Sequence, residues 1–395
     1  MKAANPINIA IACGGTGGHL FPGLAVAEQL RERGCAVTLL ISPKEVDQQA
    51  VANVTGMEIV TLPAVGLTRR SAIAFLRGSI RSYRAAAKVF RTHPPAAVLA
   101  MGGFTSAPPI LAGRRLGART FLHESNSIPG RANRWLSHVV NRAFVGFPSA
   151  GARLRRCGVT ETGTPVRPEF QLRGAAACRS ALGLDPARPV LLVMGGSQGA
   201  GGINDLVMRS LPVFARLASD WQWFHLTGPA DTEKVKQAYA ANGLNAVVHP
   251  FFANMALALG GATAAISRAG ASSLAELAAM RVPALLIPYP TATDNHQFHN
   301  AHAFVLAGAA RLLEQQKATP EAVAGALVDF MENTDVRERT QRALAQWHTP
   351  DAAREIAEAM LKAAGFGARE LSSVGGLEIC DAADYKAALP SRGAA

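Results

Sequence analysis

Residues 14–19 read Gly14-Gly15-Thr16-Gly17-Gly18-His19 and join an apolar, strand-like run over residues 7–13 to a helical pattern over residues 22–33. Glycines in such a turn let backbone amides approach a bulky anion, and the following helix directs its unpaired N–H groups to the same point. The turn predicts a site for a phosphate or a sugar hydroxyl, although a glycine-rich turn that binds nothing has the same composition. His19 favours the functional interpretation, because an imidazole can exchange a proton near neutral pH.

The length of 395 residues predicts two domains. The composition of the chain, with 49% hydrophobic and 17% charged residues, predicts that these domains have sizeable cores. Its five cysteines are odd in number and lack a C-x-x-C pair, so we expect neither a disulfide framework nor a zinc site. The N-terminal residues lack a secretory signal pattern, and no apolar run reaches the length of about 18 residues that a membrane span needs. These features are typical of a protein of the reducing cytoplasm.

The positive charge lies in the first half of the chain. Residues 1–160 contain 20 Lys+Arg and 6 Asp+Glu, a balance of +14, whereas residues 161–395 contain 20 and 22, a balance of −2. The first half is therefore expected to face an anionic surface or substrate.

The segment over residues 67–94 contains seven basic residues and no acidic one. The basic positions recur at helical spacing beside an apolar stripe, which predicts a basic amphipathic helix. Three interpretations stay open: a core-packed helix with a solvated basic face, a helix whose start dips into an anionic bilayer, and a nucleic-acid-binding helix. Nucleic acid is the weakest of these, because the segment lacks interleaved aromatic residues. The residues assigned to the bilayer interpretation are Ile73, Phe75, Leu76, Arg77 and Arg81.

The same plan of strand, glycine loop and helix recurs after a Gly/Pro-rich joint at residues 163–168. Residues 190–194 predict a strand, a second glycine loop follows, and a helix begins near residue 203. The repeat predicts two doubly wound α/β domains with glycine loops on both sides of a cleft. An NAD-binding domain is disfavoured, because Ser42-Pro43-Lys44 stands where a ribose-binding acidic residue would end the second strand.

A second anion-binding turn is predicted at residues 270–273, where Gly270-Ala271-Ser272-Ser273 opens a helix. Glu276 lies where a carboxylate can accept hydrogen bonds from ribose hydroxyls, and Gln297 and Asn300 are expected to bond a sugar.

Seven motifs, in order, closely resemble those of the MurG family, bacterial UDP-N-acetylglucosamine-dependent enzymes of glycosyltransferase family 28. They cover about residues 6–364 and read GGTGGHLFPGLAVA, GGFTSAP, HESN, TPVR, GGSQGA, SRAGASSLAE and DNHQFHNA. The resemblance implies the GT-B fold, an α/β architecture of two Rossmann-like domains facing a cleft. It implies an acceptor and membrane-facing domain over residues 1–163 and a UDP-GlcNAc-binding domain over 164–349. A helix at about 350–364 is expected to pack back on the first domain, and residues 366–395 are expected to form a poorly ordered tail.

The resemblance also implies a reaction, namely inverting transfer of N-acetylglucosamine from UDP-GlcNAc to the C4 hydroxyl of undecaprenyl-diphosphate-MurNAc-pentapeptide in peptidoglycan synthesis. The enzyme would be peripheral on the cytoplasmic face of the inner membrane, with the anionic membrane surface and other cell-wall synthesis proteins as partners. No nucleic acid, cofactor or metal is expected. A UDP-GlcNAc 2-epimerase, a soluble natural-product glycosyltransferase and a non-enzymatic sugar-nucleotide sensor stay open as alternatives.

Site residues follow from the same motifs. His19 is the first candidate for the catalytic base and Glu124 the second. Phe104 is expected on the acceptor side, together with the bilayer residues of the 67–94 segment. The donor site is expected to comprise Thr16, Gly17, Gly18, Asn126, Arg167, Ser197, Phe252, Ala271, Ser272, Ser273, Leu274, Ala275, Glu276 and Gln297.

Overall fold

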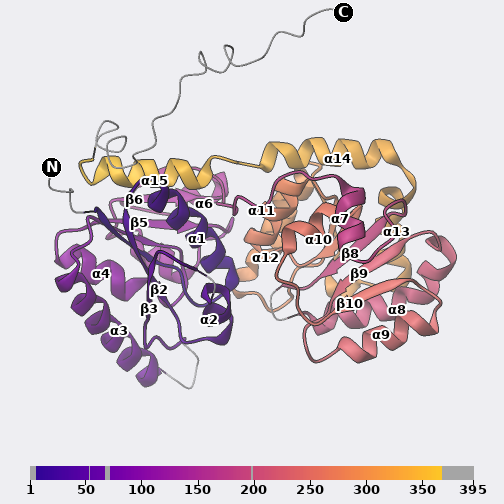
Figure 1. The fold of residues 1–395 in the computed structure, drawn as a ribbon, viewed down its shortest axis with the longest axis horizontal. Helices are drawn as coiled ribbons and strands as arrows, with labels where there is room; N and C mark the ends of the chain where they lie inside the picture. Colours follow the sequence, from indigo (N-terminus) through magenta and orange to yellow (C-terminus); the bar gives the residue numbers. More distant parts are fainter. Residues whose placement is uncertain (1–5, 53, 67–71, 197–198, 367–395) are drawn as a thin grey trace, which may run out of the picture.

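The computed structural model describes residues 6–52, 54–66, 72–196 and 199–366. Two sheets form its framework (Figure 1). The first sheet contains β1 (Asn8–Ala12), β2 (Ala36–Ile41), β3 (Glu58–Thr61), β4 (Ala97–Ala100), β5 (Arg119–Glu124), β6 (Arg142–Val145) and β7 (Gly158–Glu161). The second contains β8 (Val190–Met194), β9 (Gln222–Leu226), β10 (Ala246–His249), β11 (Ala264–Ser267), β12 (Ala284–Leu286) and β13 (Arg311–Leu312).

Helices connect the strands. Those of the first half are α1 (Gly17–Glu32), α2 (Glu45–Val51), α3 (Ala72–Thr92), α4 (Ala107–Arg115), α5 (Arg131–Leu136) and α6 (Pro148–Gly151). Those of the second half are α7 (Ala175–Ala181), α8 (Gly201–Leu217), α9 (Thr232–Ala241), α10 (Met255–Gly261), α11 (Ala271–Met280), α12 (His296–Leu306), α13 (Pro320–Glu332), α14 (Thr334–Trp347) and α15 (Ala352–Ala363). We call the first sheet with α1–α6 and α15 the first lobe, and the second sheet with α7–α14 the second lobe.

Both sheets are parallel and doubly wound. Their strand orders are β3-β2-β1-β4-β5-β6-β7 and β10-β9-β8-β11-β12-β13, so the direction of winding reverses beside β1 and beside β8. Open sheets of this kind bind ligands outside the carboxyl ends of their strands, at the point of reversal. Both predicted glycine loops begin at these points, and the expected pair of doubly wound α/β sheets is confirmed.

Each sheet buries both of its faces, which explains why its central strands are apolar without alternation. On β1, Ile9 and Ile11 join the core under α1 and α15, whereas Ala10 and Ala12 join the core under α3 and α4. The strand therefore uses the two-residue period of a β-strand to fill two different cores.

Helix α1 begins at Gly17, five residues before the predicted start near residue 22. The prediction was wrong because it placed Pro22 at the first helical position, where proline is most common. In the structure Pro22 lies inside the helix and removes the N–H that would bond to the Gly18 carbonyl. That carbonyl finds a partner in the second lobe, as described below.

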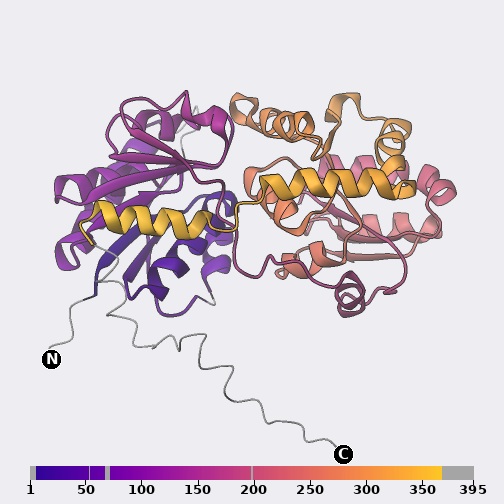
Figure 2. The same ribbon diagram turned by 90° about the horizontal axis from the view of Figure 1, so that it is seen from above.

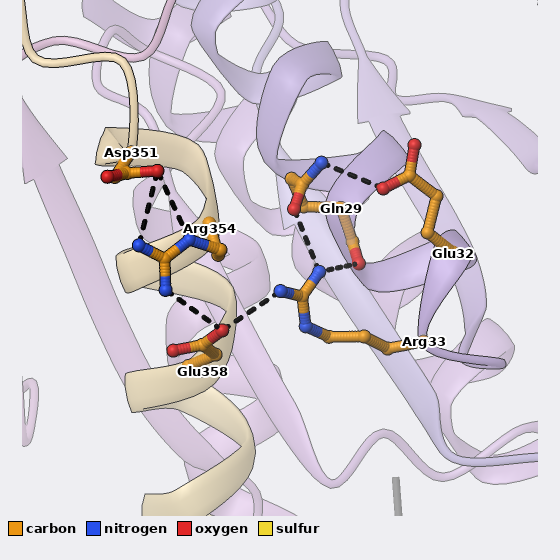
Figure 3. Close-up of polar contacts among 6 residues, drawn as sticks. All are labelled: Gln29, Glu32, Arg33, Asp351, Arg354 and Glu358. Carbon is orange, nitrogen blue, oxygen red and sulfur yellow. Dashed lines mark hydrogen bonds and ion pairs between the residues drawn. The ribbon is translucent and has the colours of Figure 1, made fainter. Parts of the chain in front are cut away.

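The last helix returns to the first lobe (Figure 2). Helix α14 lies on the second lobe, and α15 places Ile356, Met360 and Leu361 in the core beside α1. Figure 3 shows the polar contacts beside this apolar seam, where Arg33, the C-cap of α1, donates to Glu358 of α15 over 2.9 Å. The return of α15 ties the two lobes together through a second connection.

Helix length and hydropathy bear on membrane association. Within the part of the chain that the structure describes, no helix is both long and apolar enough to cross a bilayer.

The domain boundary at residue 163 stays a prediction. The tail was expected over residues 366–395, and all of it after residue 366 lies outside the described residues.

Candidate active site

The glycine loop after β1 is fixed at both backbone groups of Gly15. This residue has a φ of 115°, which is costly for any side chain. Its N–H donates to Asp47 Oδ2 over 2.6 Å, and its carbonyl oxygen accepts from Lys44 Nζ over 2.9 Å. The Gly14 carbonyl accepts from Thr105 Oγ1 over 2.7 Å. The loop therefore reaches the first turn of α1 in one defined conformation.

The first turns of α1 and α11 meet across the two lobes. Ser272 Oγ donates to the Gly18 carbonyl over 3.1 Å, the same carbonyl that Pro22 leaves without an intrahelical partner. Each first turn carries unpaired N–H groups and the positive end of a helix dipole. Two positive ends placed together favour an anion between them, and a diphosphate is an anion of suitable size.

His19 lies on the third position of α1, in contact with the loop after β4. A Cβ atom added to Gly102 or Gly103 would lie 3.0 Å from its ring, and both residues have a positive φ, so glycine is favoured at these two positions. Its Nδ1 is 3.2 Å from Thr16 Oγ1. Burial lowers the pKa of His19 to about 4, against the opposing field of Asp47. The imidazole is neutral at physiological pH and can accept a proton.

Glu124 ends β5 and is 3% exposed. Its Oε1 accepts from the backbone N–H and the side-chain amide of Asn126, and its Oε2 accepts from the Gly130 N–H and from Asn133 Nδ2, all at 2.9–3.1 Å. Burial raises the pKa of Glu124, and these hydrogen bonds oppose the shift. Because both oxygens are occupied twice, the geometry favours a role in holding Asn126 over a role as a base.

Asn300 joins the lobes, although the sequence predicted that it bonds a sugar. It is fully buried, and its Oδ1 accepts from the backbone N–H and the hydroxyl of Ser127, both over 2.9 Å. Its Nδ2 donates to Asn126 Oδ1 over 3.0 Å and to the Ala269 carbonyl over 3.2 Å. Protein groups occupy the amide completely in this structure, which corrects the expectation. The ion pair between Arg134 and Asp294 over 2.7 Å is a second link between the lobes. Arg134 is close in sequence to Ser127, and Asp294 is close to Asn300.

The predicted donor helix contributes side chains and backbone in different ways. Ser272, Ser273 and Glu276 of α11 are half-buried, whereas Leu274 is 1% exposed and belongs to the core of the second lobe. Leu274 and Ala271 can therefore offer a ligand only their backbone. Burial raises the pKa of Glu276 to about 7, and hydroxyl groups that donate to this carboxyl would favour its charged form.

Arg167 connects the joint between the lobes with α1. Its guanidinium lies 4.5 Å from the ring centroid of Phe21 and 5.2 Å from that of Phe170, and it pairs with Glu169 over 2.9 Å. Its positive charge lowers the pKa of Glu276, in opposition to burial. The predicted donor site therefore has a positive charge close enough to act on the Glu276 carboxyl.

Three other residues were predicted for the donor site, namely Gln297, Phe252 and Ser197. Gln297 Oε1 accepts from the N–H groups of Tyr289 and Ala269, and its amide nitrogen has no acceptor among the described residues. Phe252 is half-buried and packs edge-on against Phe224, with ring centroids 5.2 Å apart. Ser197 lies outside the described residues.

The acceptor and membrane residues separate into two groups. Phe104 lies at the site, because its ring covers Gly15 and its centroid is 5.2 Å from Lys44 Nζ. Helix α3 lies on the outer side of the first lobe, away from the second lobe (Figure 1). Ile73 and Leu76 are 70% and 60% exposed, Phe75 is half-buried, and Arg77 and Arg81 are exposed.

Asp47, Lys44 and Asn133 also belong to the site, although no sequence motif indicated them. Of these three residues, Asp47 had the clearest signal in the sequence, because it is an acidic residue in the first turn of the helix after the second strand. A dinucleotide-binding domain would direct such an acid to a ribose. Here Asp47 binds the amide of Gly15 instead, which no spacing rule indicates.

Comparison with known proteins supports the predicted family. The model of the glycosyltransferase family 28 N-terminal domain matches residues 9–145, and that of the C-terminal domain matches residues 190–356. These two matches include every described site residue named above except those of the joint, such as Arg167.

Individual relatives extend over most of the chain. UDP-N-acetylglucosamine--N-acetylmuramyl-(pentapeptide) pyrophosphoryl-undecaprenol N-acetylglucosamine transferase of Xanthomonas campestris pv. campestris strain 8004 is 38% identical over 368 residues, 92% of this chain and 84% of the relative. The enzyme of the same name from Anaeromyxobacter dehalogenans strain 2CP-C is 35% identical over 356 residues, 89% and 92% of the two chains. The crystal structure of Acinetobacter baumannii MurG superposes with a TM-score of 0.72 at 28% identity, covering 90% of this chain and all of that one. The expected GT-B fold is thereby confirmed, and the chain belongs to the MurG family of glycosyltransferases, within glycosyltransferase family 28.

Proposed function

We propose that this glycosyltransferase moves N-acetylglucosamine from UDP-GlcNAc to the C4 hydroxyl of undecaprenyl-diphosphate-MurNAc-pentapeptide, and that it does so where α1 meets α11. The observation that carries the proposal is the hydrogen bond from Ser272 Oγ to the Gly18 carbonyl. It brings two helix N-termini from opposite lobes together at an uncompensated positive site, which suits the diphosphate of the donor.

The second lobe would hold the donor. Glu276 accepts hydrogen bonds from the ribose hydroxyls, the amides at the start of α11 bind the diphosphate, and the free amide nitrogen of Gln297 binds the sugar. Phe252 packs against the uracil. In this arrangement C1 of the sugar faces the first lobe.

The first lobe would supply the base. The C4 hydroxyl oxygen of the acceptor attacks C1 as the bond between C1 and the diphosphate oxygen breaks, and the bonding electrons leave with UDP. His19 takes the hydroxyl proton, since its imidazole is unprotonated at physiological pH. Arg167 and the two helix N-termini stabilise the negative charge that develops on the leaving diphosphate.

Release of UDP tests the reaction. We expect the purified chain to release UDP from UDP-GlcNAc only when a polyprenyl-diphosphate-MurNAc acceptor is present. UDP release with the donor alone, or with a soluble acceptor of another class, would favour an epimerase or a natural-product glycosyltransferase. Binding of UDP-GlcNAc without turnover under every acceptor would favour a sensor.

We further propose that the first lobe docks on the cytoplasmic face of the inner membrane through the start of α3. Ile73 and Leu76 are exposed beside Arg77 and Arg81, so apolar side chains can enter the bilayer surface while the arginines contact anionic head groups. Other cell-wall synthesis proteins are the partners that this location would bring within reach.

Substitution of the two apolar side chains gives a direct prediction. The double variant Ile73→Ser/Leu76→Ser is expected to bind anionic vesicles at least about tenfold more weakly, because each buried aliphatic side chain contributes about 1.5–3 kcal/mol. Co-sedimentation with vesicles containing phosphatidylglycerol measures the effect. Leu306→Ser is the matched control, since Leu306 is 75% exposed on α12 of the second lobe. Equal losses in both variants would contradict docking through α3.

A further inference from the structure

Asp47 is a fully buried carboxylate whose bonds converge on the glycine loop. It lies in the first turn of α2 and is 0% exposed. Its Oδ2 accepts three hydrogen bonds, from the Gly15 N–H over 2.6 Å, from the Ser42 N–H over 3.1 Å and from Ser42 Oγ over 2.5 Å. Its Oδ1 has no hydrogen-bond partner among the described residues. A buried carboxylate is costly, so this one needs a compensating role.

Lys44, whose charge is opposite to that of Asp47, binds the other backbone group of Gly15. Lys44 Nζ donates to the Gly15 carbonyl, and the Phe104 ring covers Gly15 on one side. Asp47 and Lys44 thus hold the N–H and the carbonyl of a residue whose φ of 115° would otherwise be free to change. The next residue, Thr16, is the N-cap of α1 and places its hydroxyl 3.2 Å from His19 Nδ1.

We propose that Asp47 is a positioning residue for the transfer reaction, which fixes the loop from Gly14 to Thr16 and thereby orients His19 and the first turn of α1. The inference rests on the proposed function of this site. Asp47 does not touch the reacting atoms, and it acts through Gly15 and Thr16. A carboxylate suits this place because a charged acceptor makes a stronger bond to a backbone N–H than a neutral one.

Asp47 also affects the base through its charge. Burial is the largest influence on the pKa of His19, which it lowers to about 4, while Asp47 raises the pKa and His296 and Lys44 lower it. The charge of His19 in turn lowers the pKa of the buried His123, in addition to the larger effect of burial. Asp47 is therefore the one group among these that increases the proton affinity of His19. Removing its charge should weaken the base as well as loosen the loop.

Three variants separate this role from a general loss of structure. Asp47→Asn keeps the shape of the side chain and removes the charge, Asp47→Glu restores the charge, and Asp205→Asn is the matched control. Asp205 lies on α8 with its side chain 57% exposed and pairs with Lys234 at the surface over 2.9 Å. The readouts are kcat, the KM for UDP-GlcNAc, hydrogen exchange of the peptide over residues 13–20, and the pKa of His19 from NMR titration.

For Asp47→Asn we expect kcat to fall about tenfold, because small displacements of a catalytic group cost at least this much. The KM for UDP-GlcNAc should change less than about threefold, since the donor binds mainly to the second lobe. Exchange of the 13–20 peptide should accelerate, and the pKa of His19 should fall. Asp47→Glu should recover part of kcat, and Asp205→Asn should match the parent chain in all four readouts.

Unchanged kcat, exchange and His19 pKa in Asp47→Asn would overturn the inference. If that variant fails to fold, Ser42→Ala replaces it, because it removes the hydroxyl bond that orients Asp47 Oδ2 and leaves the carboxylate in place; faster exchange of the 13–20 peptide then supports the inference, and unchanged exchange contradicts it. If the parent chain shows no acceptor-dependent release of UDP, the proposed function fails. The exchange and titration readouts still decide in that case whether Asp47 holds the loop.

Discussion

The variant His19→Ala is expected to lose turnover by about 10²–10⁴-fold, the range that a positioned general base contributes. His19 sits at the start of α1, neutral at physiological pH and held between Thr16 and the glycines after β4. In the proposed site the donor binds mainly to α11 and Gln297, so the affinity for UDP-GlcNAc should change less than about threefold. Steady-state UDP release gives the first quantity, and calorimetric titration with UDP-GlcNAc gives the second.

The control for this prediction is His93→Ala. His93 lines a shallow hollow with Asn8 and Ala36, at the amino ends of the first strands and so at the opposite edge of the sheet from His19. The parent chain should also lose kcat/KM as the pH falls through about 4, where His19 takes up a proton and can no longer act as a base. Equal losses of turnover and donor affinity in His19→Ala would remove His19 from the chemistry.

Replacing Glu276 by glutamine is expected to weaken UDP-GlcNAc binding by about 10–10²-fold. Hydrogen bonds to a charged group contribute about 1.5–3 kcal/mol, and the variant loses the charge while keeping the shape. Burial raises the pKa of Glu276 to about 7 in the free chain. In the proposed site, ribose hydroxyls donate to the carboxylate and stabilise it, so donor binding should release a proton.

The proton released from Glu276 sets the direction in which donor affinity changes with pH. Donor affinity should rise as the pH increases through about 7, since less of the free chain then has to give up a proton from Glu276. Glu276→Gln should remove this dependence. Glu321→Gln, an exposed position on α13 of the second lobe, should leave both the affinity and its pH dependence unchanged. Affinity that is independent of pH in the parent chain would contradict the role of Glu276 at the ribose.

The sequence predicted the architecture because its signals are local. Each glycine loop, strand and motif is formed by neighbouring residues, and the two doubly wound sheets followed from them. The predicted start of α1 was wrong because proline is most common at the first helical position. Here Pro22 lies inside the helix, and Ser272 of the other lobe supplies the hydrogen bond that the Gly18 carbonyl loses.

Contacts between distant segments were beyond the reach of the sequence. Asn300 stands in a polar motif that suits a sugar ligand, yet its partners Ser127 and Asn126 lie more than 170 positions away. Asp47 looked like an ordinary acidic residue at a helix start, and only the fold brings its carboxylate to Gly15. The apolar stripe of α3 was visible, but its division into exposed Leu76 and buried Phe90 depends on where α3 rests on the lobe.

The placement of the donor between two facing helix starts is the claim on which the proposed chemistry depends. A crystal structure of the chain with UDP-GlcNAc tests it most directly. We predict that the diphosphate accepts hydrogen bonds from the amides of residues 271–273, that the uracil lies on the second lobe, and that C1 of the sugar faces His19. A uracil bound against the arginine-rich first lobe, or a sugar with C1 directed away from His19, would contradict it.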